Sequence, residues 1–467
     1  MKFLLVRPGL KDNNNFFIFT PSTHPPLGLL YIGSILEQNG HKVEVIDFYA
    51  EDISEQKLKN SLKSCDVVGM TVYTYDYYAA VEVSRMIKNI DPDIPLIIGG
   101  PHCTFLSKRS LSDIPLADIS VIGEGEVVIN DIVQNLNGYK KLHDINGIIF
   151  RENGSIVTNK PPKVTENLDS LPFPARHLVE KYDYGSFPFG YKLKKKTTSL
   201  MTTRGCPFKC RFCSRYSNFI KNWGFRQRSA ENVVKEILEM NEKYHSLIII
   251  DDNFLADKKR AHDIFDRLLK SDKEIDILIG GARVDTAEKK LYLKMKKTGV
   301  KFILYGLESG NQDVLDFYNK QITLQQIRNA TKIARKMNFF IYASFIFGAP
   351  METKEHIEKT IKFACSLPID VAIFGLLGYM YGSSLWFEAV KNGKISEDEY
   401  LKIADKNQGL GNMTKEELLD FTMKAYKEFY FRPSYLASQI YRSVLRHDYS
   451  LLLNGIKFFP LIKTIGK

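Results

Sequence analysis

The sequence predicts an α/β protein with two successive domains. Short apolar runs alternate with amphipathic segments from residue 2 to about residue 137, and the alternation begins again near residue 197. Prolines gather between the two stretches, at Pro161, Pro162, Pro172 and Pro174, which is typical of a domain boundary. With 467 residues, 44% of them hydrophobic and 25% charged, the chain can bury full-sized cores, and it is not a disordered, collagen-like or disulfide-rich protein.

The first domain, residues 1–140, is expected to be doubly wound (Rossmann-like). Its predicted strands are Phe3–Val6, Val43–Asp47, Val67–Thr71, Leu96–Gly99 and Ile119–Ile122. Its predicted helices are Leu27–Asn39, Tyr78–Asn89 and Glu126–Leu136. In such folds ligands bind at the carboxyl ends of the strands, and glycine there lets a bulky ligand approach the backbone. Residues 141–190 are expected to form a linker with a hairpin at Gly147–Phe150 and Ile156–Thr158.

The second domain, residues 191–384, is expected to be a partial (β/α)6 barrel with its active site at the carboxyl ends of the strands. The predicted strands are Ser199–Thr203, Leu247–Asp251, Ile275–Ile279, Lys301–Tyr305, Ile341–Phe347 and Val371–Leu376. The predicted helices are Ala230–Tyr244, Lys259–Lys270, Ala287–Lys297, Leu324–Lys336 and His356–Ser366. Residues 385–467 are expected to form a small helical C-terminal region, with helices at Lys415–Tyr430 and Ser434–Arg446.

Three of the six cysteines lie within eight positions, at Cys206, Cys210 and Cys213, in a loop after a predicted strand. Three thiolates with this spacing can bind three irons of a [4Fe–4S] cluster and leave the fourth iron open for a substrate. A structural zinc ion would require a fourth Cys or His nearby, and none closely follows Cys213. A zinc site and three unrelated loop thiols remain as alternatives.

This segment resembles the radical S-adenosylmethionine superfamily, whose hallmark is C-x3-C-x2-C with an aromatic residue before the last cysteine, here Phe212. The resemblance implies that S-adenosylmethionine binds the open iron and is cleaved to a 5′-deoxyadenosyl radical, with an electron from an external donor. Other strand-end segments are similar to cosubstrate-binding motifs of the superfamily, and they contain Asp252, Arg283, Glu308, Ser309, Gly348 and Pro350. We expect Arg283 to pair with the cosubstrate carboxylate, and Glu308 and Ser309 to bond its amino group or ribose. No residue is assigned a catalytic role.

The first domain resembles the cobalamin-binding subfamily of these enzymes. Similar segments are Pro25–Ile32, which contains Gly28, then Gly99-Gly100-Pro101-His102 and Gly123-Glu124-Gly125-Glu126, and Thr71 ends a strand that can line the corrin face. The D-x-H-x-x-G signature that supplies a cobalt ligand in other cobalamin proteins is absent. We therefore expect cobalamin without a histidine ligand; His24 and His102 are the alternatives, as is a domain that has lost cobalamin. Methylthiotransferases hold a second cluster on three N-terminal cysteines, whereas only Cys65 and Cys103 precede this motif.

The resemblance implies methylation of an unactivated carbon, with cyclisation or rearrangement as the alternative reaction. Between Ser186 and Ala230 there are eleven basic residues and no acidic one, which attracts an anionic partner. Modification of a nucleic acid is a further hypothesis, which we favour less because no RNA-binding appendage is recognisable.

The C-terminal tail combines aromatic and aliphatic residues with Arg442 and Arg446, and the apolar segments Leu451–Leu453 and Phe458–Ile462 follow. Such a tail can lie on an anionic membrane surface, which favours a hydrophobic or lipid-like substrate; a helical cap packed on the barrel is the alternative. Few cysteines and no apolar run of about 18 residues predict a cytoplasmic protein, in part peripheral to the inner face of the membrane.

Overall fold

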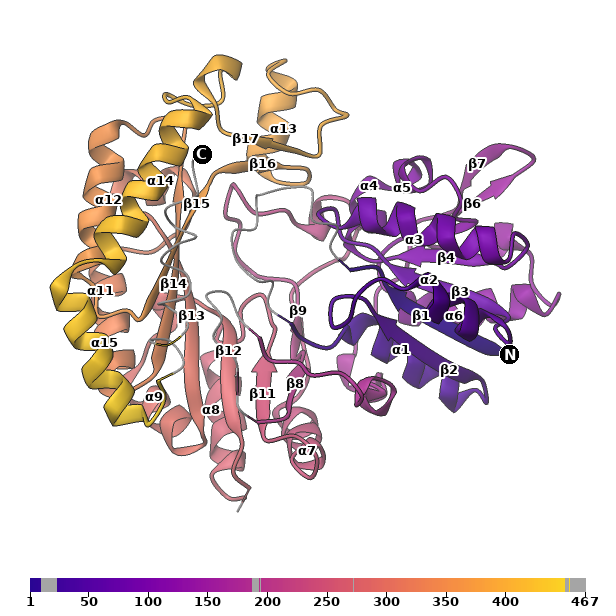
Figure 1. Cartoon of the computed structure of the whole chain (residues 1–467), viewed down its shortest axis with the longest axis horizontal. Helices are drawn as coiled ribbons and strands as arrows, with labels where there is room; N and C mark the ends of the chain where they lie inside the picture. Colours follow the sequence, from indigo (N-terminus) through magenta and orange to yellow (C-terminus); the bar gives the residue numbers. More distant parts are fainter. Residues whose placement is uncertain (10–22, 187–192, 194, 272, 450–452, 454–467) are drawn as a thin grey trace. The chain divides into compact units, whose positions relative to one another are not determined.

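The computed structural model describes residues 1–9, 23–186, 193, 195–271, 273–449 and 453 (Figure 1). These residues form two compact units. Unit 1 comprises residues 1–9, 23–184 and 216–226, and unit 2 comprises the others. The segment 216–226, which follows the three cysteines closely, thus belongs to unit 1 although its neighbours on both sides belong to unit 2.

Unit 1 contains a seven-stranded sheet in the order β2-β1-β3-β4-β5-β6-β7. Its parallel strands are β1 (Lys2–Arg7), β2 (Lys42–Asp47), β3 (Val67–Thr71), β4 (Leu96–Gly99) and β5 (Ile119–Val121). This confirms the predicted doubly wound fold, and the strand order reverses between β1 and β3, where such folds bind ligands.

Helices cover both faces of this sheet, and each face has its own buried cluster of apolar side chains. The helices are α1 (Leu27–Gln38), α2 (Glu55–Leu62), α3 (Tyr77–Ile90), α4 (Pro101–Leu106), α5 (Lys108–Asp113) and α6 (Gly125–Leu136). Three short 3₁₀ helices lie at Leu142–Asp144, Leu168–Ser170 and Arg176–Val179. The sequence did not predict α2, α4 and α5, because segments of six to eight residues are too short for a clear helical periodicity.

The predicted hairpin is present as β6 (Ile148–Glu152) and β7 (Ser155–Thr158). It does not stand in a free linker, because β6 pairs antiparallel with β5 and extends the sheet of unit 1. The backbone donors and acceptors at the free edge of β5 account for this difference from the prediction.

Unit 2 contains a six-stranded parallel sheet in the order β15-β14-β13-β12-β11-β8. Its strands are β8 (Thr197–Leu200), β11 (Ser246–Ile249), β12 (Asp276–Ala282), β13 (Val300–Glu308), β14 (Phe340–Phe347) and β15 (Val371–Leu376). The predicted partial barrel is thereby confirmed. Two small ribbons accompany it, formed by β9 (Thr203–Arg204) with β10 (Arg226–Gln227) and by β16 (Gly378–Met380) with β17 (Leu401–Ile403).

The helices of unit 2 alternate with the strands and then continue into the C-terminal region. They are α7 (Ala230–Met240), α8 (Lys258–Leu268), α9 (Lys289–Lys297), α10 (Gln312–Phe317), α11 (Leu324–Lys336), α12 (Lys354–Ser366), α13 (Ser384–Lys391), α14 (Lys415–Tyr430) and α15 (Pro433–Arg446). Further 3₁₀ helices lie at Tyr216–Asn218 in unit 1 and at Val284–Thr286 and Lys406–Gln408 in unit 2. Figure 1 shows α11, α12, α14 and α15 along the outer side of β13–β15.

The edge strand β15 is covered by α14. The Tyr426 hydroxyl accepts a hydrogen bond from Phe374 N and donates one to Phe374 O, both at 3.2 Å. The Tyr430 hydroxyl does the same with Ala372, at 3.1 and 2.9 Å. Two tyrosines of α14 therefore satisfy backbone groups that an open barrel would leave unpaired.

Within the described ranges, no helix combines the length and the apolar character that crossing a membrane requires. Most of the predicted apolar segment Leu451–Leu453 and all of Phe458–Ile462 lie outside the described residues.

Candidate functional site

The three cysteines lie in the loop after β9, at the carboxyl ends of the strands of unit 2. Cys210 is buried, Cys206 is half-buried and Cys213 is exposed. The loop is held by backbone contacts, because Arg211 N donates to Tyr318 O at 2.9 Å and Ser214 Oγ donates to Tyr381 O at 2.8 Å. The loop is thus fixed to unit 2 on both sides of Cys213.

The electrostatics around the thiols favour a cationic ligand. The protein around Cys213 desolvates its thiol, and together with Cys210 and Asp252 this raises its pKa to about 12. Burial raises the pKa of Cys206 as well, with a contribution from Asp252. Asp252 lies three residues after the end of β11, and desolvation raises the pKa of its carboxyl. A metal cluster would offset this crowding of acids and thereby stabilise the thiolates.

No three His, Cys, Asp or Glu side chains of the described part of the chain are arranged to hold a single metal ion. In a [4Fe–4S] cube each cysteine binds a different iron, so three sulfurs need not converge on one point.

Arg283 packs the cysteine loop against the barrel. Its guanidinium lies 3.5 Å from the ring centroid of Phe208, which is inside the loop. Its Nη2 donates to Asp285 Oδ2 at 3.0 Å and to Lys320 O at 2.7 Å, and its Nε donates to Asp285 Oδ1 at 3.1 Å. The predicted pairing of Arg283 with a cosubstrate carboxylate would require it to exchange these partners.

Glu308 ends β13 and forms a buried ion pair with Lys320 at 2.6 Å. Its φ of +63° is strained for a residue other than glycine, which is common where a side chain is aimed at a functional site. Lys320 Nζ also lies 5.8 Å from the ring centroid of Phe212, next to Cys213. Lys320 was not predicted, because it follows α10 rather than a strand.

Ser309 is completely buried and contacts Thr360 of α12, with 3.2 Å between the two hydroxyl oxygens. Its Oγ also accepts a hydrogen bond from Asn311 N at 3.2 Å. These contacts hold the strand-end loop and leave Ser309 no exposed surface.

Gly348 and Pro350 lie in the turn after β14. Gly348 has φ +107°, and a Cβ there would lie 2.9 Å from Ala404 Cβ. The buried carboxylate of Glu352 accepts hydrogen bonds from Gly348 N and Ala349 N at 2.7 and 2.8 Å. Burial raises the pKa of Glu352 to about 7 in spite of these hydrogen bonds.

Several buried polar atoms of unit 2 have no hydrogen-bond partner within the described ranges: both amide atoms of Asn253, the hydroxyl of Tyr318 and Oε1 of Glu352. Asn253 directly follows Asp252, and the Tyr318 ring makes an edge contact with Phe212 at 5.1 Å. Since buried polar groups in proteins are normally satisfied, these atoms fit hydrogen bonds to a bound ligand beside the cysteine loop.

In unit 1 the predicted residues Thr71, Gly99 and Gly100 lie together at the carboxyl ends of β3 and β4. Gly100 has φ +106°, and a Cβ there would lie 2.9 Å from Thr71 Oγ1 and 3.0 Å from Val72 O. Gly28 lies in the first turn of α1, where a Cβ would have no neighbour within 4 Å. The open space at Gly28 fits the approach of a large ligand, whereas Gly100 allows β3 and β4 to pack closely at this edge.

A polar cluster that the sequence did not predict lies at the ends of β1, β2 and β3. Asp47 pairs with Arg7 at 3.6 Å and accepts a hydrogen bond from the Tyr184 hydroxyl at 2.8 Å. Asp76 accepts a hydrogen bond from the Tyr49 hydroxyl at 3.2 Å, and burial raises its pKa to about 7. Arg7 and Asp47 are the last residues of β1 and β2. Because ligands of such folds bind at the carboxyl ends of the strands, the sequence could have indicated both residues.

The predicted residues Gly123 and Glu124 have contacts inside unit 1. A Cβ on Gly123, which has φ +81°, would lie 3.2 Å from Pro162. The buried Glu124 accepts a hydrogen bond from Thr165 N at 2.6 Å and pairs with Arg226 at 2.9 Å. Glu124 therefore links the end of β5 to the segment 216–226.

Both candidate histidines make contacts within unit 1. His102 is fully buried, pairs with Asp113 at 3.2 Å and stacks on Tyr77. The Nδ1 atom of His24 lies 3.2 Å from Pro25 O, and burial with the nearby charge of Arg7 lowers the pKa of His24 to about 4.

The basic window between Ser186 and Ala230 is not a continuous free surface. Its residues Lys195, Arg211, Arg226 and Arg228 form ion pairs with Asp276, Glu388, Glu124 and Glu236. Lys192 and Lys194 lie outside the described residues. Asp276, Glu388 and Glu124 come from distant parts of the sequence, whereas Glu236 lies eight residues after Arg228.

Comparisons with known proteins agree with both cofactor sites. The model of the Radical SAM superfamily matches residues 200–364, and that of the B12 binding domain matches residues 19–133. The chain is 35% identical over 449 residues to "Uncharacterized methyltransferase PH0819" from Pyrococcus horikoshii, covering 94% of this chain and 95% of the relative. The chain belongs to the cobalamin-binding radical S-adenosylmethionine enzymes.

Two further similarities extend over most of this radical enzyme. It is 28% identical to an anaerobic magnesium-protoporphyrin IX monomethyl ester cyclase from Rubrivivax gelatinosus, over 93% of this chain and 78% of the relative. Its fold is that of the radical S-adenosylmethionine methyltransferase TsrM from Kitasatospora setae, with TM-score 0.67 and 18% identity over 84% of this chain and 75% of that chain. The cofactors of this radical enzyme are a [4Fe–4S] cluster, S-adenosylmethionine and cobalamin.

Proposed function

We propose that this enzyme methylates an unactivated carbon of a small or lipid-like substrate. The observation that carries the proposal is one chain that combines a three-cysteine loop in a partial barrel with a doubly wound unit that matches the B12 binding domain. When bound, the cluster supplies the electron that cleaves S-adenosylmethionine, and cobalamin supplies the methyl group.

We assign the cluster to Cys206, Cys210 and Cys213. For S-adenosylmethionine we propose hydrogen bonds to the partnerless amide of Asn253, which follows Asp252, and to the pair of Glu308 with Lys320. A buried ammonium next to the cysteines is suited to a carboxylate, and a buried carboxylate is suited to an ammonium.

Other predicted residues hold the loops that form this site. Arg283 holds Phe208 and so positions the cysteine loop, while Ser309 holds the loop that carries Glu308. Gly348 and Pro350 shape the turn in which Glu352 accepts two backbone hydrogen bonds. Phe212 packs against Tyr318 and covers the side of the cluster.

For cobalamin we propose contacts with the exposed backbone at Gly28, Gly99 and Gly100 and with the side chain of Thr71. Gly123 and Glu124 are proposed to support this edge, since their contacts are with Pro162, Thr165 and Arg226. We propose cobalamin binding without a histidine ligand, supported by the burial of His102 against Asp113 and Tyr77, with His24 as the alternative ligand.

The test is anaerobic reconstitution with iron, sulfide and cobalamin, followed by mass spectrometry. Methyl transfer by a radical route consumes two molecules of S-adenosylmethionine and gives S-adenosylhomocysteine and 5′-deoxyadenosine in equal amounts. S-adenosylhomocysteine without 5′-deoxyadenosine, or neither product, would contradict the proposal.

A radical cyclase is the second candidate, favoured by the similarity to the cyclase from Rubrivivax gelatinosus. It would give 5′-deoxyadenosine without S-adenosylhomocysteine in the same experiment. For both reactions we propose an external electron donor and a peripheral position at a membrane through the C-terminal tail. Modification of a nucleic acid is not favoured, since four cations of the basic window have acidic partners within the chain.

A further inference from the structure

Helix α15 turns its polar side toward the barrel and its apolar side toward solvent. The buried positions are Tyr435, Gln439 and Ser443, one helical turn apart. On the opposite side Ile440, Tyr441, Val444 and Leu445 each expose more than half of their surface, and Leu436 exposes 38%. A surface helix of a globular protein normally has the reverse arrangement.

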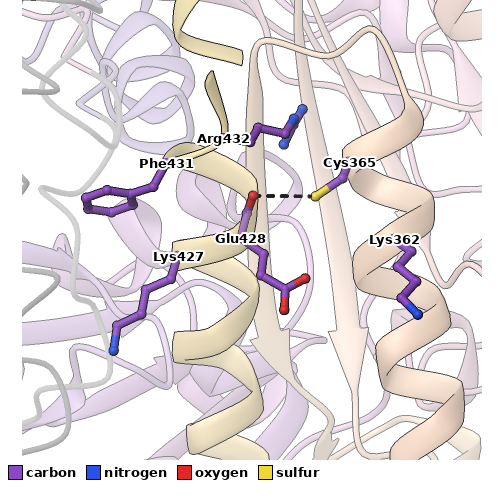
Figure 2. Close-up of a pocket in the computed structure, with 6 residues that line it drawn as sticks. All are labelled: Lys362, Cys365, Lys427, Glu428, Phe431 and Arg432. Carbon is purple, nitrogen blue, oxygen red and sulfur yellow. Dashed lines mark hydrogen bonds between the residues drawn. The ribbon is translucent and has the colours of Figure 1, made fainter. Parts of the chain in front are cut away.

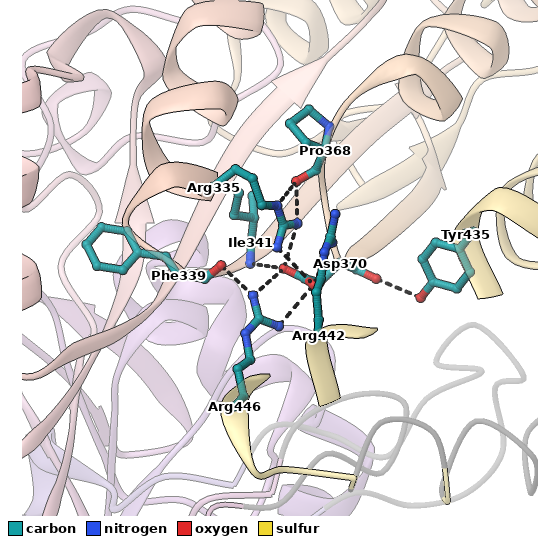
Figure 3. A network of polar contacts seen from close by, with 8 residues as sticks. All are labelled: Arg335, Phe339, Ile341, Pro368, Asp370, Tyr435, Arg442 and Arg446. Atoms are coloured by element: carbon teal, nitrogen blue, oxygen red, sulfur yellow. Dashed lines mark hydrogen bonds and ion pairs between the residues drawn. The ribbon is translucent and has the colours of Figure 1, made fainter. Parts of the chain in front are cut away.

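Polar contacts with the loop before β15 fix this orientation (Figure 3). The fully buried Asp370 pairs with Arg442 and Arg446 of α15 at 2.9 and 3.0 Å, and with Arg335 of α11 at 3.1 Å. Arg446 Nη2 also donates to Phe339 O at 2.7 Å. Burial alone would raise the pKa of Asp370, but Arg446, Arg335 and Arg442 outweigh it and lower the pKa to about 2.

The contacts of Tyr435 complete the attachment, since its hydroxyl donates to Asp370 O at 2.7 Å. The arginines that the sequence suggested for a membrane-facing surface are therefore the anchors of the helix. The apolar residues are the ones that are presented outward, so the exposed face is set by the fold and not by a loose attachment of the helix.

The two helices that meet at Asp370 are basic, whereas α14, which also contacts α15, carries three lysines and four acids. Helices α11 and α15 meet at Asp370 and together carry six basic and no acidic side chains. Around Asp370 itself, three guanidiniums face one carboxylate, so positive charge remains after pairing. An acidic protein surface or an anionic lipid surface would complement this charge, whereas another basic surface would not.

A pocket of about 550 Å³ lies just before the first turn of α15 (Figure 2). It is lined by Lys362 and Cys365 of α12, by Lys427 and Glu428 of α14, and by Phe431 and Arg432. Three cations against one acid suit an anionic group, and the ring of Phe431, which also lines the pocket, is exposed.

We propose that α15 docks on an anionic phospholipid bilayer, with its apolar face in the headgroup region and the pocket binding a lipid phosphate. Exposed aliphatic and tyrosine side chains beside a basic surface are the features of interfacial helices that lie on a membrane. This inference goes beyond the proposed methyl transfer and does not depend on it.

The experiment is flotation of the full chain with vesicles of phosphatidylglycerol and phosphatidylcholine, compared with phosphatidylcholine alone. We expect binding to the anionic vesicles only, and weaker binding at high salt. The variant I440S/V444S should bind at least about tenfold more weakly, because it removes two exposed aliphatic side chains from the interface. The variant K362Q/K427Q should bind the anionic vesicles about tenfold more weakly, because it removes two of the cations that line the pocket.

Matched controls make the same kinds of substitution elsewhere on unit 2. L269S/L293S removes two exposed leucines, and K289Q/K290Q removes two lysines of α9. Both should bind vesicles like the wild type. Equal binding of I440S/V444S and the wild type would overturn the proposal, as would equal binding to both vesicle types. A dimer in solution that I440S/V444S converts to a monomer, without vesicle binding, would show that a second copy covers this face and would also overturn it.

Discussion

The carboxyl edges of the two parallel sheets differ in how their polar side chains are satisfied. At the edge of unit 1, Asp47 is paired with Arg7 and Tyr184, and Asp76 is bonded to Tyr49. At the edge of unit 2, the amide of Asn253 and the hydroxyl of Tyr318 are buried without a partner in the described part of the structure. At the first edge the carboxyl groups are satisfied within the unit and Arg7 Nε is a buried atom without a partner in the described residues, whereas at the second edge a whole amide is left for hydrogen bonds to a ligand.

The largest effect is expected at the cysteine loop. The variant C210A should lose most of its iron and its broad absorbance near 400 nm after anaerobic reconstitution, because a cube held by two cysteines is not retained. Cleavage of S-adenosylmethionine should fall by at least about a thousandfold, since it depends on the bound cluster. The matched control is C365A, in which a half-buried cysteine of α12 is removed and the iron content should be unchanged. Normal iron content in C210A would contradict the assignment.

The next effect concerns the buried pair of unit 2. K320M leaves Glu308 buried without its counter-charge, and we expect a loss of about 3–5 kcal/mol in the free energy of unfolding, measured by urea denaturation. The double variant E308Q/K320M should recover part of this loss. For comparison, K294M breaks the partly exposed pair with Asp266 and should cost less than about 1 kcal/mol. If K320M lowers the free energy of unfolding no more than K294M does, Glu308 and Lys320 do not form a buried ion pair.

The pH dependence of the free energy of unfolding tests one buried carboxyl group in each unit, Glu352 in unit 2 and Asp76 in unit 1. The folded protein raises the pKa of Glu352 from 4.5 to about 7, so between these values the native state keeps a proton that the unfolded state has released. Stability is therefore expected to fall as pH rises from about 4.5 to 7, by roughly 3 kcal/mol for this group. Asp76, with its pKa raised from 3.8 to about 7, should act in the same direction in unit 1.

Each contribution can be separated by an isosteric variant. E352Q and D76N remain uncharged throughout, so the slope of unfolding free energy against pH should be smaller in each variant than in the wild type. An unchanged slope in E352Q would mean that Glu352 is ionised in the folded state, and the same holds for Asp76 in D76N.

The smallest effect on stability is expected at Gly28. A Cβ at this position has no neighbour within 4 Å, so G28A should change the free energy of unfolding by no more than about 0.5–1 kcal/mol, and in the stabilising direction. If cobalamin approaches this backbone, the same variant should bind it several-fold more weakly in an equilibrium titration. In the contrasting variant G100A the added Cβ would meet Val72 O at 3.0 Å on a residue with φ +106°, so it should lose stability.

The elements that the sequence predicted accurately depend on local patterns. Strands β3 and β4 have the predicted bounds because continuous apolar runs mark strands that are buried on both faces. The cysteine loop was predicted because all three ligands lie within eight residues. Helix α11 was predicted with its bounds because its apolar residues follow the helical period; the structure adds a capping box of Thr323 with Gln326 at its start.

The features that were not predicted depend on contacts between distant residues. Arg211 and Tyr318, whose backbone contact fixes the cysteine loop, are more than one hundred residues apart in the chain, and nothing local marks Lys320 or Asn253 as site residues. The orientation of α15 also required Asp370, because a helical period shows that two faces differ but not which one is buried.

The path of segment 216–226 limits how this enzyme can be taken apart. The segment leaves unit 2 shortly after Cys213, stacks Tyr216 on Phe105 in unit 1 and provides Arg226 as the partner of Glu124 before the chain returns. A fragment that stops at Tyr184 would lack that partner, and a fragment that starts at Gly185 would carry a piece of the other unit. Neither unit is encoded by one continuous stretch of sequence. A chimera that exchanges unit 1 between relatives must therefore also exchange segment 216–226, which follows the cysteine loop.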